Sequence, residues 1–301
     1  MKSIRILWKF SRPHTIIGSI ISICTLYLII YRQHGVFDIP YFAMALIIGI
    51  SCNVFIVGIN QVADVDIDKI NKPDLPIPSG LLKVREAKLI VASALFISLT
   101  TALFISPFLL LIIGLATFIG WAYSMPPFHL KKHHLPAALA IATVRGVLLN
   151  AGGFLVFNYV INHELQMPKN VFILTIFVTI FSIVIAWFKD LPDIAGDAKY
   201  NIQSLAILYS PKTTLILGHL LVGSAYLFTI YLKYIDFLHS EIQSSQTKVL
   251  LYGHIFLIIL FILNAFFLKI NQHLSLKNFY KRFWWFFFAE YILYLVAYSI
   301  S

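Results

Sequence analysis

Amide and carboxylate side chains recur at a helical spacing where a long apolar run ends. In the segment NQVADVDIDKINKP, residues 60–73, Asn60, Asp64 and Asp68 follow one another in steps of four. If the preceding helix continues through this segment, the three groups share one face, about 6 Å apart along the axis, and Asp66 faces water. Neighbouring carboxylates repel unless a cation lies between them, and oxygen-only ligands favour a hard cation such as Mg²⁺.

A second acidic segment, KDLPDIAGD at residues 189–197, has a related spacing. Asp190, Asp193 and Asp197 share a face if the segment is helical. Pro192 suits the first turn of a short helix, which Asp190 would then cap. One acidic cluster is compatible with an ordinary solvated helix end, whereas two clusters favour a shared binding site.

The elements that carry these segments are apolar enough to cross a membrane. The chain has 301 residues, of which 59% are hydrophobic and 12% charged, and its mean hydropathy is +0.85. A soluble protein is nearer half apolar and a quarter charged. The pattern predicts an all-α, polytopic membrane protein, since each long apolar run is a candidate transmembrane helix. Nine such helices are expected, at about residues 13–31, 41–62, 88–106, 108–124, 136–160, 170–188, 213–235, 249–269 and 283–300.

The distribution of Lys and Arg predicts the orientation of these helices. With the N-terminus in the cytoplasm, 18 of the 23 basic residues fall on the cytoplasmic side, four fall outside, and Arg145 lies within a span. This asymmetry is the positive-inside pattern. Both acidic segments then belong to cytoplasmic connections, at about residues 60–88 and 189–212. The net charge of +10 is therefore explained by topology and by attraction to anionic lipid or substrate, and nucleic acid is not an expected partner.

Two facing sets of carboxylates can hold Mg²⁺ ions that in turn bind a diphosphate. This pattern suits the ionisation of an allylic prenyl diphosphate, because metal ions neutralise the charge that grows on the leaving diphosphate. Walls embedded in the lipid would house the prenyl tail, and aromatic faces can stabilise an allylic cation. The chain has 26 Phe, 15 Tyr and 5 Trp, but membrane proteins are rich in aromatic residues, so this count alone does not decide the function.

These residues resemble the motifs of the UbiA superfamily of intramembrane aromatic prenyltransferases. NQVADVDID at 60–68 resembles the first motif, N-x-x-x-D-x-x-x-D, and KDLPDIAGD at 189–197 resembles the second, D-x-x-x-D. FSRPHT at 10–15, AYSMPPFHLKKH at 122–133 and VRG at 144–146 are similar to one branch, the homogentisate prenyltransferases. That branch comprises the phytyl- and solanesyltransferases of tocopherol and plastoquinone synthesis.

The resemblance implies nine helices around a central cavity, with the two Asp-bearing connections over its cytoplasmic side. It implies Mg²⁺ as the cofactor, bound with the diphosphate by Asp64, Asp68, Asp193 and Asp197, with Asn60 beside them. The implied reaction is transfer of a prenyl group from an allylic prenyl diphosphate to an aromatic acceptor, most readily homogentisate. With that acceptor, prenylation in the family is coupled to loss of CO₂.

Further side chains are expected to contact the substrates. The resemblance implies that Lys72 and Lys131 hold phosphate groups as point charges, with Lys132 as the neighbouring alternative to Lys131. Asp190 would assist the metal ions or act on the aromatic acceptor. Tyr123 is either a site residue or an aromatic side chain of the membrane-interface belt.

Arg145 is expected about nine residues into the fifth span. An unpaired arginine at the centre of a span costs at least roughly 2.5–3.5 kcal/mol. It either snorkels to the cytoplasmic headgroups or faces the cavity as a cation, for diphosphate or for an acceptor carboxylate, and the cavity is favoured. His14 either contacts the acceptor or is an ordinary interfacial residue.

Two other functions remain open. A sister prenyltransferase would use 4-hydroxybenzoate, a naphthoate or chlorophyllide as its acceptor. A divalent-cation transporter would need acids near the middle of the membrane, and Glu290 is the only carboxylate well inside an expected span. No plastid transit peptide precedes the family-like start at Trp8. We therefore expect one membrane-embedded domain, residues 1–301, in a bacterial inner membrane with its active site on the cytoplasmic side; the oligomeric state is not predicted.

Overall fold

The computed structural model of the chain describes residues 2–239, 244–270 and 272–300. Within these residues all regular elements are helices, and the only β-type pairing is an isolated bridge between His133 and Gln203. This confirms the predicted all-α class.

The helices follow one another along the chain with short connections. They are α1 (Lys2–Phe10), α2 (Pro13–His34), α3 (Ile39–Ala63), α4 (Val65–Asn71), α5 (Val84–Ile105), α6 (Pro107–Ser124), η1 (Leu130–Lys132), α7 (His134–Ala142), η2 (Thr143–Gly152), α8 (Gly153–Asn162), α9 (Lys169–Lys189), α10 (Ile194–Lys199), α11 (Leu205–Leu208), α12 (Pro211–His239), α13 (Ser245–Phe266) and α14 (His273–Ser299).

Eight helical segments in the described parts of the chain are long and apolar enough to cross a membrane. They match the first eight predicted spans to within four residues at each end, and the fifth of them is the continuous run α7–η2–α8, His134–Asn162. Helix α14 is not in this group, because Glu290 and several polar aromatic residues lower its hydropathy. It also begins at His273, ten residues before the predicted start. Crossing of the membrane by α14, and so a count of nine, remains a prediction.

Local signals in the sequence explain where the long helices begin and end. The Asp38 carboxylate accepts a hydrogen bond from the Tyr41 backbone N–H at 3.0 Å and caps α3. Ser106 caps α6 in the same way, ahead of Pro107, a residue that lacks the N–H an interior helical position requires. Gly35, at φ 73°, ends α2 in the left-handed conformation that glycine adopts without strain.

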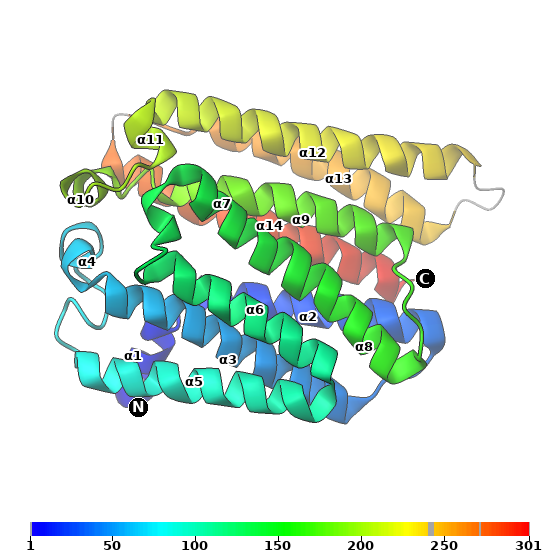
Figure 1. The fold of residues 1–301 in the computed structure, drawn as a ribbon. Helices are drawn as coiled ribbons and strands as arrows, with labels where there is room; N and C mark the ends of the chain where they lie inside the picture. Colours follow the sequence, from blue (N-terminus) through cyan, green and yellow to red (C-terminus); the bar gives the residue numbers. More distant parts are fainter. Residues whose placement is uncertain (1, 240–243, 271, 301) are drawn as a thin grey trace.

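The helices pack as a bundle in which α9 and α14 lie between the pair α12 and α13 and the group α2, α3 and α5 (Figure 1). The contact between α9 and α14 is aromatic: the Phe181 and Phe283 rings stack with their centroids 4.3 Å apart. Close packing is the main attraction between helices in lipid, because lipid is as apolar as the side chains. Accordingly, Gly218 of α12 lies directly against Phe188 of α9, where a Cβ would not fit.

Both acidic connections lie at one end of this bundle. Helices α4 and α10 are neighbours at that end, where α1 also lies, and the C-terminal end of α14 lies at the opposite end (Figure 1). The fold therefore brings together two segments that are more than 120 residues apart in the sequence.

Candidate active site

The first acidic segment bends at Asp64 and is not one straight helix. Helix α3 ends at Ala63, α4 begins at Val65, and Asp64 between them has φ −103° and ψ 17°. The hydrogen bonds of an α-helix nevertheless continue across the bend: Asp64 N–H donates to the Asn60 carbonyl at 2.9 Å, and Asp68 N–H donates to the Asp64 carbonyl at 2.7 Å. The bend therefore preserves the predicted register.

The side chains of this segment point towards the protein interior or towards solvent as the register predicts. The Asn60 amide donates to the Asp64 carboxylate at 2.8 Å, and Asp68 is buried at 3% exposure. Asp66 faces solvent and pairs with Lys69 at 2.8 Å.

The second acidic segment differs from the prediction at its start. Asp190 is the residue that ends α9, and Asp193 occupies the N-cap position of α10. Asp190 is therefore not the cap of a short helix, because a turn at residues 190–193 separates it from α10. Asp193 and Asp197 remain one helical turn apart, with Asp197 N–H donating to the Asp193 carbonyl at 3.1 Å.

Asn71, at the end of α4, joins the two segments. Its amide nitrogen donates to the Asp197 carboxylate at 3.1 Å, and its amide oxygen accepts from the Gly196 backbone N–H at 2.9 Å. A Cβ at position 196 would overlap with the Asn71 side chain, so only glycine allows this approach. Lys72 adds an ion pair with Asp193 and lies 3.8 Å from Asp68.

Two further lysines bind the remaining carboxylates. Lys131 pairs with Asp64, and the two side chains are only 6% and 13% exposed. Lys132, the alternative from the sequence, is exposed, so the structure places Lys131 at the site. Lys189 lies 3.3 Å from Asp190 and donates to the Tyr123 hydroxyl.

Burial and neighbouring charges shift the pKa values of several of these side chains. Burial, with repulsion from Asp190 and Asp193, raises the pKa of Asp197 to about 7. Burial also raises the pKa of Asp68. Burial lowers the pKa of Lys131, although Asp64 opposes this effect. At Asp197 the repulsion from Asp190 and Asp193 adds to the effect of burial, and an added cation would relieve this repulsion.

The carboxylates fit a metal ion that also takes oxygens from a ligand. Among the described residues no group of three His, Cys, Asp or Glu side chains is placed to enclose a metal ion by itself. Asp68 Oδ2 is buried without a hydrogen-bond partner, which leaves an acceptor for a cation. Asp64, Asp68, Asp193 and Asp197 provide only oxygen ligands, as Mg²⁺ prefers, and Mg²⁺ commonly binds through one or two carboxylates plus substrate phosphates.

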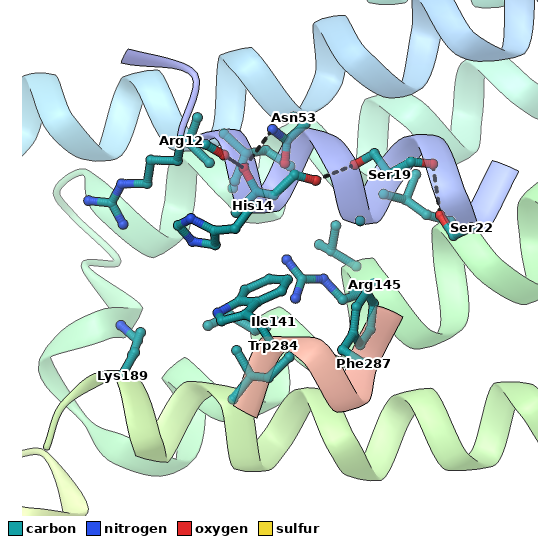
Figure 2. Close-up of a pocket in the computed structure, with 18 of the residues that line it drawn as sticks. Arg12, His14, Ser19, Ser22, Asn53, Ile141, Arg145, Lys189, Trp284 and Phe287 are labelled. Atoms are coloured by element: carbon teal, nitrogen blue, oxygen red, sulfur yellow. Dashed lines mark hydrogen bonds between the residues drawn. The ribbon is translucent and has the colours of Figure 1, made fainter. Parts of the chain in front are cut away.

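A cavity of about 190 Å³ extends from this acidic end into the bundle, between α2, α3, α6, η2 and α14. Figure 2 shows Arg12 and Lys189 at one end of this cavity. Arg145, which belongs to η2, lies farther into the cavity, on the side of Ser19 and Ser22 of α2. Asn60 and Tyr123 also line it. Because it joins cationic groups to an apolar interior, the cavity can hold a ligand with an anionic head.

A second cavity of about 80 Å³ continues towards the opposite end of the bundle. It shares Ser19, Ser22 and Leu149 with the first cavity. Its remaining lining is almost entirely apolar, including Leu26, Ile30, Ile48, Leu109 and Phe157. Together the two cavities form a path that is polar at one end and apolar at the other.

Arg145 faces the first cavity. Its guanidinium carbon lies 4.8 Å from the centroid of Trp284 and 5.2 Å from that of Phe287. His14 also lines the cavity, and its ring packs edge-on against Trp284 with centroids 4.8 Å apart. Glu290 does not line it: this carboxylate is buried and pairs with His254 at 2.9 Å.

The sequence reading missed several of the residues gathered here, namely Arg12, Asn53, Asn71, Lys189 and Trp284. Arg12 and Lys189 lie within the segments FSRPHT and KDLPD, so those segments already contained the signal. Arg12 has φ 51°, a left-handed conformation uncommon for a residue with a side chain, at the turn between α1 and α2. Nothing local to the sequence identifies Trp284, because its place depends on how α14 packs.

Comparison with known proteins agrees with this geometry. A sequence profile of the UbiA prenyltransferase family matches residues 21–288. The chain is 35% identical to homogentisate phytyltransferase from Synechocystis sp., over 99% of this chain and 96% of that protein. It is 34% identical to the chloroplastic homogentisate solanesyltransferase of Arabidopsis thaliana, over 95% of this chain and 75% of that one. The fold matches a UbiA homolog from Archaeoglobus fulgidus bound to GPP and Mg²⁺, with a TM-score of 0.64, 18% identity, and coverage of 97% and 99%.

Proposed function

The chain belongs to the UbiA prenyltransferase family, and we propose that this integral membrane prenyltransferase uses Mg²⁺ to transfer a prenyl group to homogentisate. The donor is an allylic prenyl diphosphate. The whole chain then forms one membrane-embedded catalytic domain, in a bacterial inner membrane, with its site on the cytoplasmic side.

The observation that carries this proposal is the junction of the two acidic segments at the end of the bundle where Arg12, Asn60 and Lys189 line the mouth of the first cavity. Lys72 and Asn71 join α4 to α10, and Lys131 holds Asp64 beside Asn60. Four carboxylates and several cations thus lie together beside this mouth. A diphosphate needs both, because its charge is neutralised by metal ions and by Lys or Arg together.

In this proposal the chain binds the diphosphate and excludes water from the reacting atoms. Asp64, Asp68, Asp193 and Asp197 would hold Mg²⁺, which neutralises the charge that develops on the departing diphosphate. Lys72, Lys131, Arg12 and Lys189 contact its phosphate oxygens. The bond between the prenyl carbon and oxygen breaks with its electron pair going to the diphosphate, and a ring carbon of the acceptor forms the new bond and loses its proton.

The second cavity gives the prenyl tail a place in the bundle. Its apolar lining suits a hydrocarbon chain, and the tail would exclude water from the allylic carbon. Tyr123 lines the first cavity, where its hydroxyl, held by Lys189, is available to orient the acceptor. Asp190 lies 3.3 Å from Lys189, which lines the cavity, so we assign Asp190 to positioning that lysine.

A labelled-donor assay tests the function directly. Purified protein in detergent is given labelled phytyl, geranylgeranyl or solanesyl diphosphate, Mg²⁺, and either homogentisate or 4-hydroxybenzoate. A prenylated product from homogentisate that disappears with EDTA is the expected result. Product from 4-hydroxybenzoate alone would identify a sister prenyltransferase. No product from the folded protein with any acceptor would contradict the proposed function.

A cation transporter is the weaker alternative in this geometry. Its path would need carboxylates along the interior of the bundle, yet Glu290 is held by His254 and does not line either cavity. The carboxylates of the two acidic segments gather at one end of the bundle. This distribution supports a binding site that opens at one end of the bundle over an ion path that crosses it.

A further inference from the structure

Arg145 carries a charge that no group in the described part of the protein balances. Its guanidinium makes no hydrogen bond and no ion pair with any described residue, and Nη1 is buried without a partner. Tyr280 and Tyr291, which line the same cavity, are neutral phenols. A buried cation inside the membrane is costly unless an anion pairs with it. The missing anion is therefore expected from a ligand.

The surroundings of Arg145 hold its guanidinium in place. The residue lies in η2, a π-helical stretch, a type of helix that often occurs at functional sites. The neighbouring Gly146 packs against Thr179 so closely that a Cβ would not fit, which sets the helix against α9. The faces of Trp284 and Phe287 then contact the guanidinium from α14. A charge held this firmly can recognise a ligand with little loss of side-chain freedom on binding.

Three lysines at the cavity mouth differ from Arg145 in having carboxylates beside them. Lys72 pairs with Asp193, Lys131 with Asp64, and Lys189 with Asp190. In the proposed function Asp64 and Asp193 bind the diphosphate through Mg²⁺ and Lys189 contacts it directly, so the diphosphate lies at the mouth. Arg145 lies farther along the cavity, beside Trp284 and Phe287 (Figure 2). Its anion is therefore a second one, carried by the other substrate.

We propose that Arg145 binds the carboxylate of an aromatic acid acceptor and thereby selects acids over neutral phenols. This inference rests on the proposed function. A guanidinium binds a carboxylate through two parallel hydrogen bonds, a geometry that a lysine cannot reproduce. Trp284 and His14 line the cavity beside it, so the ring of the acceptor would lie between the guanidinium and the mouth, where the allylic carbon is delivered.

Two acceptors with the same ring, one with a free carboxylate and one with that carboxylate neutralised as an ester, test the inference. Homogentisate and its methyl ester are compared on the wild-type protein, on Arg145→Gln and on Arg145→Lys, at saturating prenyl diphosphate. Arg145→Gln is expected to raise the KM for homogentisate about 10- to 100-fold, the range for charge-assisted hydrogen bonds, and to leave the KM for the ester unchanged. The KM of Arg145→Lys for homogentisate should fall between those of the wild-type protein and Arg145→Gln. Arg32→Gln is the matched control, because Arg32 is exposed at the far end of α2.

Other outcomes would overturn the inference. A higher KM for the prenyl diphosphate in Arg145→Gln, with the KM for homogentisate unchanged, would make Arg145 a diphosphate ligand. Equal KM values of the wild-type protein for the acid and the ester would also contradict the inference. This comparison does not depend on whether the Arg145 variants fold.

A binding measurement separates failure of this inference from failure of the proposed function. Equilibrium dialysis with labelled homogentisate and labelled ester needs no prenyl donor and no transfer. Preferential binding of the acid, lost in Arg145→Gln, supports the inference whether or not transfer is observed. Equal binding of the two compounds would reject it, while the transfer assay alone decides the function.

Discussion

Lys72 at the end of α4 forms an ion pair with Asp193 at the start of α10, across 121 positions of sequence. The same lysine lies 3.8 Å from Asp68, so one cation neutralises a carboxylate from each acidic segment. Burial disfavours the charged lysine, but Asp193, together with Asp68, outweighs it and raises the pKa of Lys72. This pair is the point at which two separate motifs become one site.

Removing one carboxylate from this site should abolish turnover. Asp193→Asn is expected to lower kcat by about 100-fold or more, because an electrostatic contact to the leaving group is lost. Lys72 is 34% exposed and can be solvated in the variant, so the thermal unfolding temperature should stay near that of the wild type. Asp66→Asn is the matched control, since Asp66 is exposed and pairs with Lys69 on the solvent side of α4. Full activity of Asp193→Asn would remove Asp193 from the metal site.

Mg²⁺ and diphosphate should stabilise the protein only together. The four carboxylates do not enclose an ion alone, so Mg²⁺ without a ligand should change the unfolding temperature little. With inorganic diphosphate present, saturation at about 100 times the dissociation constant adds roughly 2.7 kcal/mol to the free energy of unfolding. Differential scanning fluorimetry in detergent, with and without EDTA, measures the effect. Equal stabilisation by diphosphate in EDTA would show that the lysines suffice without a metal ion.

The contact between Asn71 and Gly196 should matter for substrate binding more than for folding. In Gly196→Ala the new methyl group would displace Asn71 from Asp197. We expect the KM for the prenyl diphosphate to rise about 10-fold, in line with loss of a hydrogen bond to a charged group. Gly114→Ala, where a Cβ meets no atom within 4 Å, is the matched control. An unchanged KM in Gly196→Ala would show that the two segments need not be joined.

The second cavity should set the length of the donor that is accepted. Gly153 lines this cavity, and a Cβ there meets no atom within 4 Å, so Gly153→Leu fills the cavity without displacing the backbone. The ratio of kcat/KM for geranylgeranyl over geranyl diphosphate should fall about 10-fold or more, since the longer tail loses its apolar contacts. Gly223→Leu, equally open but outside both cavities, should leave the ratio unchanged. An unchanged ratio in Gly153→Leu would place the tail elsewhere.

The buried pair of His254 and Glu290 should stabilise the bundle without affecting catalysis. Both side chains are buried between α13 and α14, and neither lines the first or the second cavity. Glu290→Leu leaves His254 without its partner, and we expect a loss of about 1–3 kcal/mol in the free energy of unfolding. The KM for both substrates should not change. A large change in KM with an unchanged free energy of unfolding would mean that this pair affects substrate binding at the active site.

The sequence alone was sufficient to predict the membrane class, eight spans and both acidic segments. Each of these depends on neighbours within one helix: hydropathy over about 20 residues, or a repeat of four. The spacing of Asn60, Asp64 and Asp68 held across the bend at Asp64, because the backbone hydrogen bonds continue there. Asp190 failed as a helix cap, because a turn intervenes that the spacing alone does not indicate.

The tertiary structure alone decided which groups meet. The pairing of Lys72 with Asp193, the contact of Asn71 with Asp197, and the place of Arg145 against Trp284 join residues from different helices. Periodicity shows that a helix has a polar face but not which partner that face meets. That choice depends on the rotation of each helix about its axis, which is set by packing against helices far away in the sequence.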